Sequence, residues 1–357
     1  MANTGPDYAS EVRFGVVMYG GVALAIYING VANELYELAC ATPKRGDVPA
    51  PEGSTRAVYR RLSWLLRDPA LRAAYLAHLE GQGPDPFAAG DPPDSDTRTR
   101  FVVDVISGTS AGGINGIFLA KALAQGQAFA PLKTLWVQEG DIARLINDQA
   151  SYEGIEFARR EGAPQSLLNS DRMYLKLLQA MEDMAPAVPP VGQDESSLSD
   201  ELDLFVTTTD IRGAVVPLRL FDKVVYEKRH KQVMQLQYRG AGGRTLYSDF
   251  RAELTPFLAF AARCTSSFPF AFEPMSVDDA LRLARLRPGG GGVEGSSWRG
   301  YLKGLSADDL ASGQWQRRAF GDGGYLDNKP FSYVVEDRKS TRLNSSHSDI
   351  SRMPSSA

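Results

Sequence analysis

Cysteine and histidine are scarce in this chain of 357 residues, and it has no excess of basic residues. The two cysteines, Cys40 and Cys264, are too few and too far apart for a disulfide framework or a four-ligand zinc site. They favour a reducing compartment. The 39 Lys and Arg residues face 43 Asp and Glu residues, for a net charge of -4. This balance gives no electrostatic reason to expect a nucleic-acid partner, although it does not exclude a lipid surface.

Long runs without a charged residue are also rare. The run that could be a membrane-spanning helix covers residues 14–33. Twenty uncharged residues meet the length requirement of a membrane-spanning helix. Gly20 and Gly21 interrupt the run, and the preceding residues Asp7, Glu11 and Arg13 lack the basic character of a signal peptide. The sequence therefore predicts neither a membrane span nor a signal peptide, and it predicts a protein that is cytoplasmic or peripheral at a membrane.

Apolar patterns alternate between strand and helix periods along most of the chain, which predicts an α/β fold with a largely parallel sheet and helices on both faces. Strands are expected at 12–18, near 101–107, at 202–208 and at 214–225, with a hairpin near 232–248. Helices are expected at 22–39, within 55–80, from 111 to about 124, within 128–146, at 171–184 and at 251–263. Residues 41–98 form an insertion whose flexible part, 81–98, we interpret as a lid or lipid-facing loop.

The last residues, 338–357, differ in composition from everything before them. Serine, arginine and asparagine dominate, and apolar periodicity ends. The segment is either a disordered terminus or a non-native addition, and in the second case the natural protein would be longer.

The stretch "FVVDVISGTSAGGINGIFLA", residues 101–120, orders a strand, a Gly-x-Ser-x-Gly turn and a helix. This order is typical of a nucleophile elbow, in which small neighbours let a strained serine project from the backbone. Ser110 is the candidate nucleophile, and Gly108, Gly112 and Gly113 surround it. The alternative is a glycine-rich turn that only caps a helix.

An activated serine needs a base, and the three histidines are poor candidates. His78 lies in a polar helix, His230 in the charged stretch "YEKRHKQ", and His347 in the anomalous tail. A carboxylate is the better partner, because Asp322 in "FGDGGYLDNKP" follows a short apolar stretch and precedes two glycines. The alternative for Asp-Gly-Gly is an ordinary turn in which the aspartate bonds its own backbone.

Several blocks together resemble the patatin-like phospholipases, in their order and spacing. These blocks are "MYGGVALA", "GTSAGG", "FVTTTDIRG", "ARCTSSFPFAFEPM" and "DGG". The resemblance spans residues 11–335 and implies one acyl hydrolase domain with an α/β/α sandwich and a mainly parallel sheet. It implies that Ser110 is the nucleophile and that Asp322 takes its proton directly, as a Ser-Asp dyad. It also implies an oxyanion hole made by the N–H groups of Gly20, Gly21, Val22 and Ala111.

The implied activity is hydrolysis of an acyl ester in a lipid or phospholipid, without metal or cofactor. Peripheral membrane contact is compatible with such a substrate, and the oligomeric state stays open. An aspartate, with an ordinary pKa of about 3.9, is a weak base for this task unless its site is desolvated. The oxyanion donors, each worth on the order of 3 kcal/mol, would then carry a large share of catalysis.

The glycine-rich loop departs from the family pattern. Where the family usually has Gly-Gly-Gly-x-Arg/Lys-Gly, residues 20–25 read "GGVALA". Backbone donors survive such replacements, but a non-catalytic lipid-binding or scaffold protein that retains the fold is an alternative. A nucleotide site is disfavoured because neither glycine-rich loop supplies Gly-Lys-Ser/Thr.

Overall fold

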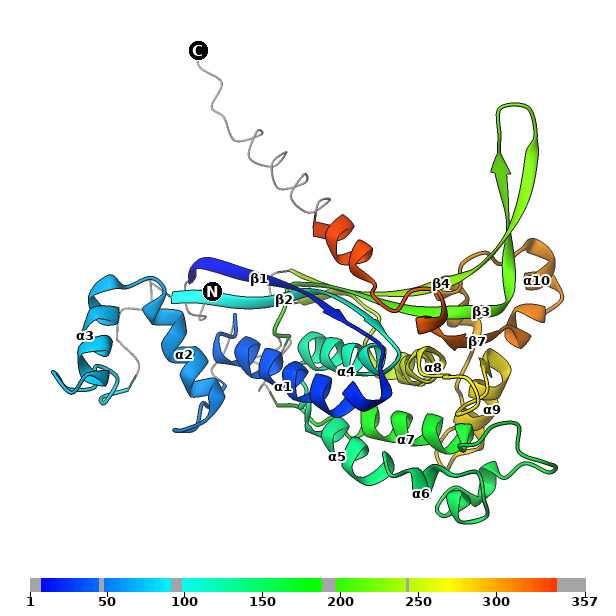
Figure 1. Cartoon of the computed structure of the whole chain (residues 1–357), viewed down its shortest axis with the longest axis horizontal. Helices are drawn as coiled ribbons and strands as arrows, with labels where there is room; N and C mark the ends of the chain where they lie inside the picture. Colours follow the sequence, from blue (N-terminus) through cyan, green and yellow to red (C-terminus); the bar gives the residue numbers. More distant parts are fainter. Residues whose placement is uncertain (1–7, 45–47, 91–97, 188–196, 242–243, 339–357) are drawn as a thin grey trace.

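A central sheet with helices packed against it forms the body of the protein in a computed structural model (Figure 1). The structure describes residues 8–44, 48–90, 98–187, 197–241 and 244–338. The predicted α/β class is confirmed, with the sheet as the central layer (Figure 1). The predicted tail, residues 338–357, lies outside the described residues from position 339 onward.

The strands of the sheet meet in an order that differs from the order of the sequence. β1, β2 and β3 run parallel to one another, whereas β4, β5, β6 and β7 pair in antiparallel fashion. In this register Met18 of β1 lies beside Gly108 of β2, and Thr208 of β3 lies beside Asp322 of β7. The strands are β1 Tyr8–Met18, β2 Arg98–Thr109, β3 Glu201–Arg219, β4 Val224–Ala241, β5 Arg244–Ser248, β6 Met275–Ser276 and β7 Ala319–Asp322.

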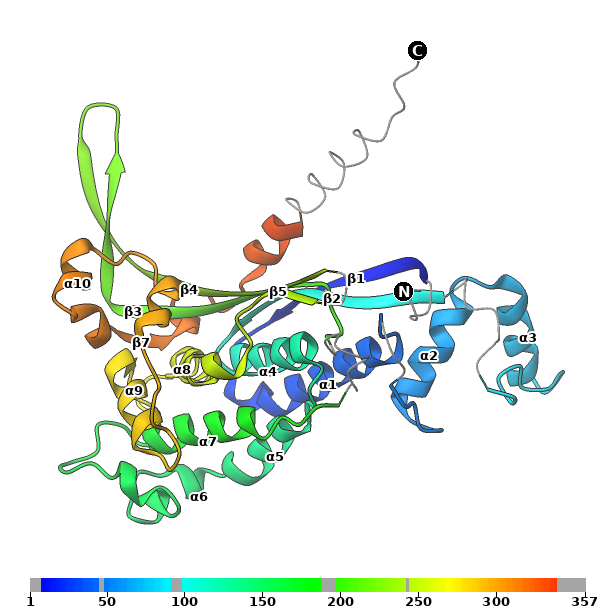
Figure 2. The same cartoon turned by 180° about the vertical axis from the view of Figure 1, so that it is seen from behind.

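The main helical layer lies on one side of the sheet, as Figure 2 shows from behind. α1, α4 and α8 lie next to the sheet, and α5, α6 and α7 lie outside them (Figure 1). A short helix at 331–338 lies on the opposite face (Figure 1). The bounds are α1 Ala25–Ala41, α4 Ala111–Gln125, α5 Ala130–Glu139, α6 Ile142–Leu145, α7 Ser170–Glu182, α8 Thr255–Thr265, α9 Val277–Leu286 and α10 Ala307–Ala311.

The central helix α4 is apolar on all sides because it is surrounded. Every residue of α4 except the last is buried, and β2 is buried along its whole length. A helix enclosed in this way has no amphipathic stripe, which explains the continuous apolar run that follows Ser110 in the sequence. This burial fixes the start of α4 against the ends of β1 and β2.

The uncharged run 14–33 is divided between the end of β1, the short 3-10 helix Val22–Leu24 and the first half of α1. The helix predicted at 22–39 is confirmed, and its apolar residues Leu24 and Val31 are exposed. Within the described part of the chain, no helix has both the length and the apolar character needed to cross a bilayer.

The insertion forms α2 (Thr55–Leu65) and α3 (Pro69–Leu79), at the end of the sheet where β2 begins (Figure 1). Ser54 and Asp68 cap these helices by accepting hydrogen bonds from backbone N–H groups. Residues 81–90 follow α3, whereas Ser110 lies at the other end of β2, twelve residues or about 40 Å away. The position of 81–90 argues against the lid hypothesis for the described part of this loop, whereas the lipid-facing alternative stays a prediction. Residues 91–97 lie outside the described residues.

The segments predicted as separate strands at 202–208 and 214–225 are instead one long strand, β3, followed by the start of β4. An irregularity in the pairing lies between Thr209 and Ala214. There the Asp210 side chain accepts hydrogen bonds from the N–H groups of Arg212 and Gly213, each at 3.0 Å. The residues between the two predicted strands therefore form a bulge, which lets β3 bend and continue as a projecting hairpin with β4.

Asp210 also forms a buried ion pair with Arg318, whose Nε lies 3.0 Å from Asp210 Oδ2. Both side chains are almost fully buried. We expect Asp210→Ala to lower the free energy of unfolding by about 3–5 kcal/mol, because it leaves a buried guanidinium without its counter-charge. Denaturant unfolding measures this loss. The matched control is Glu227→Ala, which breaks an exposed pair with Arg229 and should cost less than about 1 kcal/mol; equal losses would contradict the role of Asp210.

Candidate active site

Ser110 occupies the sharp turn between β2 and α4, as the sequence predicted. Its backbone has φ 54° and ψ -127°, and it is one of two described non-glycine residues with positive φ. Such a conformation costs about 1–3 kcal/mol and persists only where the surroundings impose it. The turn places Ser110, which is only partly buried, at the start of a buried helix.

Close backbone approach explains the glycines around Ser110. A Cβ atom at Gly112 would lie 2.3 Å from the Met18 carbonyl oxygen, and one at Gly108 would lie 2.6 Å from the Gly112 carbonyl oxygen. A Cβ at Gly20 would lie 2.9 Å from the Ser110 Cβ. The first glycine-rich loop therefore lies directly against the candidate nucleophile, and larger residues would push the two apart.

Asp322 ends β7 and is 3% exposed. Its Oδ1 accepts a hydrogen bond from the Gly324 N–H at 2.7 Å. Its Oδ2 is buried and has no fully formed hydrogen bond among the described residues. One carboxylate oxygen is thus fixed by the backbone, while the other is available to a neighbouring donor.

Ser110 lines the same cavity as Asp322. Burial raises the pKa of the Asp322 carboxyl above its ordinary value, although the Gly324 N–H, the Ser110 hydroxyl and the Arg263 guanidinium each act to lower it. Hydrogen bonds between a base and a nucleophile are often long or poorly aligned before substrate binds.

The C-terminal end of α8 supports both residues, which the sequence analysis did not foresee. Thr265 Oγ1 accepts a hydrogen bond from the Ser110 N–H at 2.8 Å, and the Ser267 carbonyl accepts one from the Asp322 N–H at 3.3 Å. Buried Arg263 donates to Ser267 Oγ at 2.8 Å. All three lie in the block "ARCTSSFPFAFEPM", but nothing local in that block identifies which of its polar residues face the site.

The backbone donors predicted for an oxyanion hole are not equivalent. The Gly20 N–H donates to Asn328 Oδ1 at 3.0 Å and is therefore already engaged. No hydrogen bond from the N–H groups of Gly21, Val22 or Ala111 is found among the described residues. Asn328 is a second residue that the sequence analysis missed, although it lies only six positions after Asp322.

A buried asparagine connects the starts of α1 and α4, next to this loop. Asn115 Nδ2 donates to the carbonyl oxygens of Ala25 at 3.2 Å and Ala111 at 2.9 Å, and Asn115 Oδ1 accepts from Asn29 Nδ2 at 3.3 Å. These bonds hold the helix that follows the glycine-rich loop against the helix that follows Ser110.

Two cavities open beside Ser110. One, of about 250 Å³, also contains Gly20, Gly21, Asp322 and Asn328 in its wall. The other, of about 210 Å³, is mainly apolar. Its lining includes Ile26, Ile114, Leu145, Met173, Phe268 and Phe272. Ser110 thus stands between a cavity that holds the carboxylate and a cavity that suits an apolar chain.

Neither described histidine lies in these walls. His78 Nδ1 lies 3.2 Å from the Gly83 carbonyl oxygen, and His230 Nδ1 lies 2.8 Å from the Asp210 carbonyl oxygen. His230 belongs to β4. His347 lies outside the described residues. Within the described ranges, no group of three or more His, Cys, Asp or Glu side chains is arranged to hold a metal ion.

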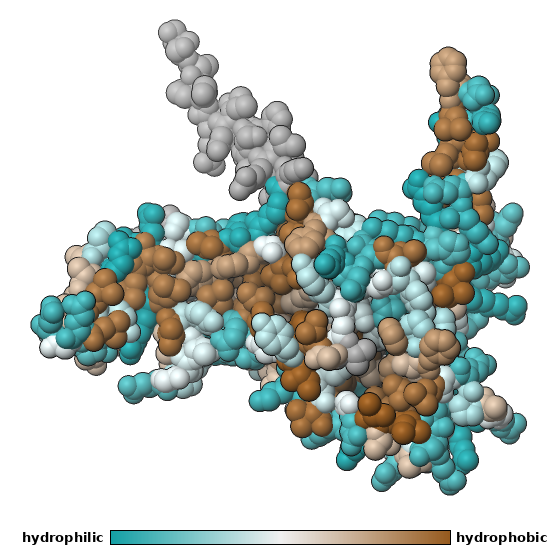
Figure 3. Space-filling view, in the orientation of Figure 1, coloured by the Kyte–Doolittle hydropathy of each residue, from teal (hydrophilic) through white to brown (hydrophobic). Residues whose placement is uncertain are grey.

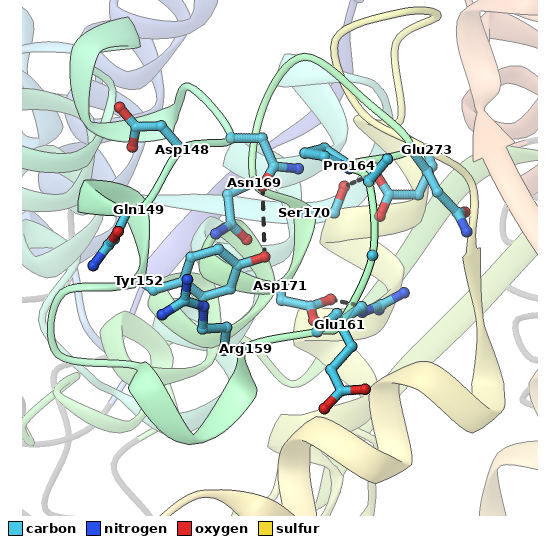
Figure 4. A pocket seen from close by; sticks show the side chains of 15 residues that line it. Asp148, Gln149, Tyr152, Arg159, Glu161, Pro164, Asn169, Ser170, Asp171 and Glu273 are labelled. Carbon is cyan, nitrogen blue, oxygen red and sulfur yellow. Dashed lines mark hydrogen bonds and ion pairs between the residues drawn. The ribbon is translucent and has the colours of Figure 1, made fainter.

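A separate polar pocket of about 250 Å³ lies between the segment 147–171 and Glu273 (Figure 4). Its charged groups largely satisfy one another: Arg160 Nε lies 2.8 Å from Asp171 Oδ2, and Ser170 Oγ donates to Glu273 at 2.6 Å. Arg263 Nη2 donates to the same Ser170 hydroxyl at 2.5 Å. The side chains of Ser170 and Glu273 in this pocket therefore hold Arg263 in place. Arg263 in turn holds the loop that carries Ser267.

Comparisons with known proteins agree with this architecture. The family model described as "Patatin-like phospholipase" matches residues 73–335. The "Uncharacterized membrane protein Rv3479" of Mycobacterium tuberculosis is 27% identical over 331 residues, which cover 91% of this chain and 26% of that protein. The chain thus spans about a quarter of the length of that relative. No solved structure matches this chain significantly. From the family match, the chain belongs to the patatin-like phospholipase family.

Proposed function

We propose that the protein hydrolyses acyl esters of lipids, with Ser110 as nucleophile and Asp322 as the base that receives its proton. Membership of the family suggests lipid acyl hydrolase activity in general. The finer assignment rests on one observation: a serine with a strained backbone lines the same cavity as a buried carboxylate whose pKa is raised. Desolvation of this kind brings an aspartate closer to the range in which it acts as a base.

In the proposed cycle, Ser110 Oγ attacks the ester carbonyl carbon while its proton passes to Asp322 Oδ2. The N–H groups of Gly21, Val22 and Ala111 stabilise the negative oxygen of the tetrahedral intermediate. Collapse of this intermediate breaks the ester bond, and the departing alcohol or lysophospholipid takes the proton from Asp322. Water then attacks the acyl-enzyme with Asp322 again as base, which releases the fatty acid and restores Ser110. No metal or cofactor enters this cycle.

The apolar cavity supports a lipid rather than a small polar ester as the substrate. Each methylene group that a ligand buries there contributes about 0.8 kcal/mol. The exposed side chains of Ile26 and Phe268 extend this apolar lining to the surface. We therefore assign the acyl chain to this cavity, and we include contact with a membrane surface in the proposal because that is where such lipids are found.

A non-catalytic lipid-binding or scaffold protein is the second candidate. It is favoured by the altered loop "GGVALA" and by the Gly20 N–H, which Asn328 already occupies. The strained backbone of Ser110 and the raised pKa of Asp322 favour the enzyme, because a scaffold needs neither.

The test is mass spectrometry of the products formed from a mixed phospholipid extract. We expect the wild-type protein to release free fatty acids and lysophospholipids, and Ser110→Ala to release neither. Binding of phospholipid without any product from the wild-type protein would support the scaffold instead.

The pH dependence of hydrolysis tests the role of Asp322 separately. Burial disfavours the charged form, so the carboxylate takes up its proton at a higher pH than an ordinary aspartate, whose pKa is about 3.9. The base is lost as the pH falls through this raised pKa, and kcat/KM should fall with it. We expect the midpoint of this acid limb above 3.9 in the pH–rate profile of a soluble ester. A midpoint at or below the ordinary value would contradict the assignment.

A further inference from the structure

A long hairpin made by the ends of β3 and β4 projects from the body of the protein, away from the helical layer (Figure 1). Its two strands pair from Ala214 with Arg229 as far as Arg219 with Val224. In this part β3 pairs only with β4, since its pairing with β7 ends at Asp210. Within the described part of the chain, the projecting hairpin, residues 211–230, is therefore a two-stranded ribbon without a third strand.

Apolar side chains cover the end of the projecting hairpin on both faces. Phe221, in the turn, is fully exposed. The register places Tyr226 opposite Pro217 and Val225 opposite Leu218, so neighbouring apolar pairs point to opposite faces. The exposed apolar residues are Val215, Leu220, Phe221, Val224, Val225 and Tyr226, and Figure 3 shows brown side chains along this projection.

Such a hairpin is an unfavourable structure in water. An isolated two-stranded ribbon is at best marginally stable, and a contiguous exposed apolar surface marks a site of interaction. A protein partner usually covers one face of a ribbon. Apolar residues on both faces and in the turn instead fit a medium that surrounds the tip.

The charge of the projecting hairpin indicates which kind of surroundings its tip would enter. Within 211–230 five Lys and Arg residues face two Asp and Glu residues, which gives a net charge of +3 in a chain whose net charge is -4. The two acidic residues, Asp222 and Glu227, each have a basic neighbour, since Lys223 follows the first and Arg229 pairs with the second at 2.9 Å. The five basic residues are Arg212, Arg219, Lys223, Lys228 and Arg229.

We propose that the tip of this hairpin inserts into the surface of an anionic lipid bilayer and tethers the protein there. Three residues of strand span about 10 Å, which matches the depth to which interfacial segments enter the headgroup and acyl boundary. Phe221 and Leu220 enter first, and Arg219 and Lys223, which flank the turn, lie at the level of the phosphates. Lys228 and Arg229 lie about 20 Å from the turn and face the anionic surface from outside. The tether is independent of hydrolysis at Ser110, so either proposal stands if the other fails.

The experiment measures binding of the full chain to vesicles by sedimentation. The protein carries Ser110→Ala, so that any hydrolysis leaves the vesicles intact. One set of vesicles is phosphatidylcholine alone, and the other is phosphatidylcholine with an equal amount of phosphatidylglycerol. We expect strong binding to the anionic vesicles, weak binding to the neutral ones, and loss of the difference at high salt.

Two pairs of variants separate the apolar and the electrostatic contributions. The double change Leu220→Ser with Phe221→Ser should lower the partition coefficient at least tenfold. Its control is Leu246→Ser, which removes an exposed apolar side chain from β5 and should change nothing. Arg219→Gln with Lys228→Gln should lower binding to anionic vesicles roughly 30-fold. Its control is Arg251→Gln, which removes an exposed charge outside the hairpin.

Unchanged binding of the Leu220 and Phe221 double variant would overturn the proposal, as would equal binding of the parent protein to both kinds of vesicle. Gel filtration addresses the rival occupant, a second copy of this chain. If the parent protein is a dimer and the same double variant is a monomer, the tip mediates self-association. This result would also overturn the tether. Unchanged thermal unfolding of each variant shows that the body of the protein is intact.

Discussion

Replacing Ser110 with alanine is expected to lower the rate of ester hydrolysis at least about a thousandfold while the protein stays folded. The variant has no atom that can form the acyl-enzyme. The proposed oxyanion donors remain, but they can assist only the slow direct attack of water on the ester. Release of a chromophore from a short-chain ester measures the rate, and circular dichroism measures the fold. Alanine at a backbone φ of 54° keeps the strain of the turn, so the variant tests the hydroxyl and not the glycines around it.

A fluorophosphonate probe, which reacts covalently with an activated serine, tests the same prediction. The wild-type protein should be labelled at Ser110, and Ser110→Ala should not be labelled. The matched control is Ser312→Ala, which removes the hydroxyl of an exposed serine next to α10 and should preserve both labelling and rate. Failure of the folded wild-type protein to react would support the scaffold candidate.

Replacing Asp322 with asparagine is the second change with a large expected effect, a loss of about 10²–10⁴ in kcat, the usual contribution of a general base. An amide cannot receive the serine proton. Its oxygen still accepts the hydrogen bond that Gly324 donates, so the local backbone should be preserved. Hydrolysis of the soluble ester measures the loss, and normal activity would exclude the dyad.

The same variant makes a prediction about stability with a definite sign. Because folding raises the pKa of Asp322, the charged carboxylate destabilises the native state at any pH above its ordinary pKa. Asp322→Asn removes this cost, so its free energy of unfolding at pH 7 should equal or exceed that of the wild type. The difference should shrink as the pH falls below the ordinary pKa. Such a trade of stability for function is common at active sites.

The histidines provide the contrast for both variants. We expect His347→Ala and His230→Ala each to leave kcat unchanged within about threefold, because the proposed cycle contains no imidazole. His230 bonds a backbone oxygen at the base of the hairpin, and His347 lies in the tail. A large loss of activity in His347→Ala would favour a Ser-His-Asp triad.

The elbow was predictable from the sequence because its causes are local. A buried strand, a turn that excludes Cβ atoms and a buried helix follow one another within residues 101–120, and each has its own pattern. The identity of Asp322 depended on the family resemblance, since its approach to Ser110 requires the pairing of β3 with β7. No local rule distinguishes this aspartate from one in an ordinary Asp-Gly turn.

The bulge at Asp210 and the engaged Gly20 N–H were not predictable, for a related reason. The sequence "DIRG" is equally compatible with a turn between two strands and with a bulge within one, and the partner strand decides. The Gly20 donor is occupied by Asn328, three hundred positions away in the chain. Contacts of this kind depend on the assembled sheet rather than on any short segment.

The shared attachment of Ser110 and Asp322 to the end of α8 has a mechanical consequence. Thr265 holds the amide of one residue, and Ser267, two positions later, holds the amide of the other. A displacement of α8 within its layer carries both residues in the same direction. A shift of this end of α8 that starts in the outer helices would therefore move the proposed nucleophile and the proposed base together.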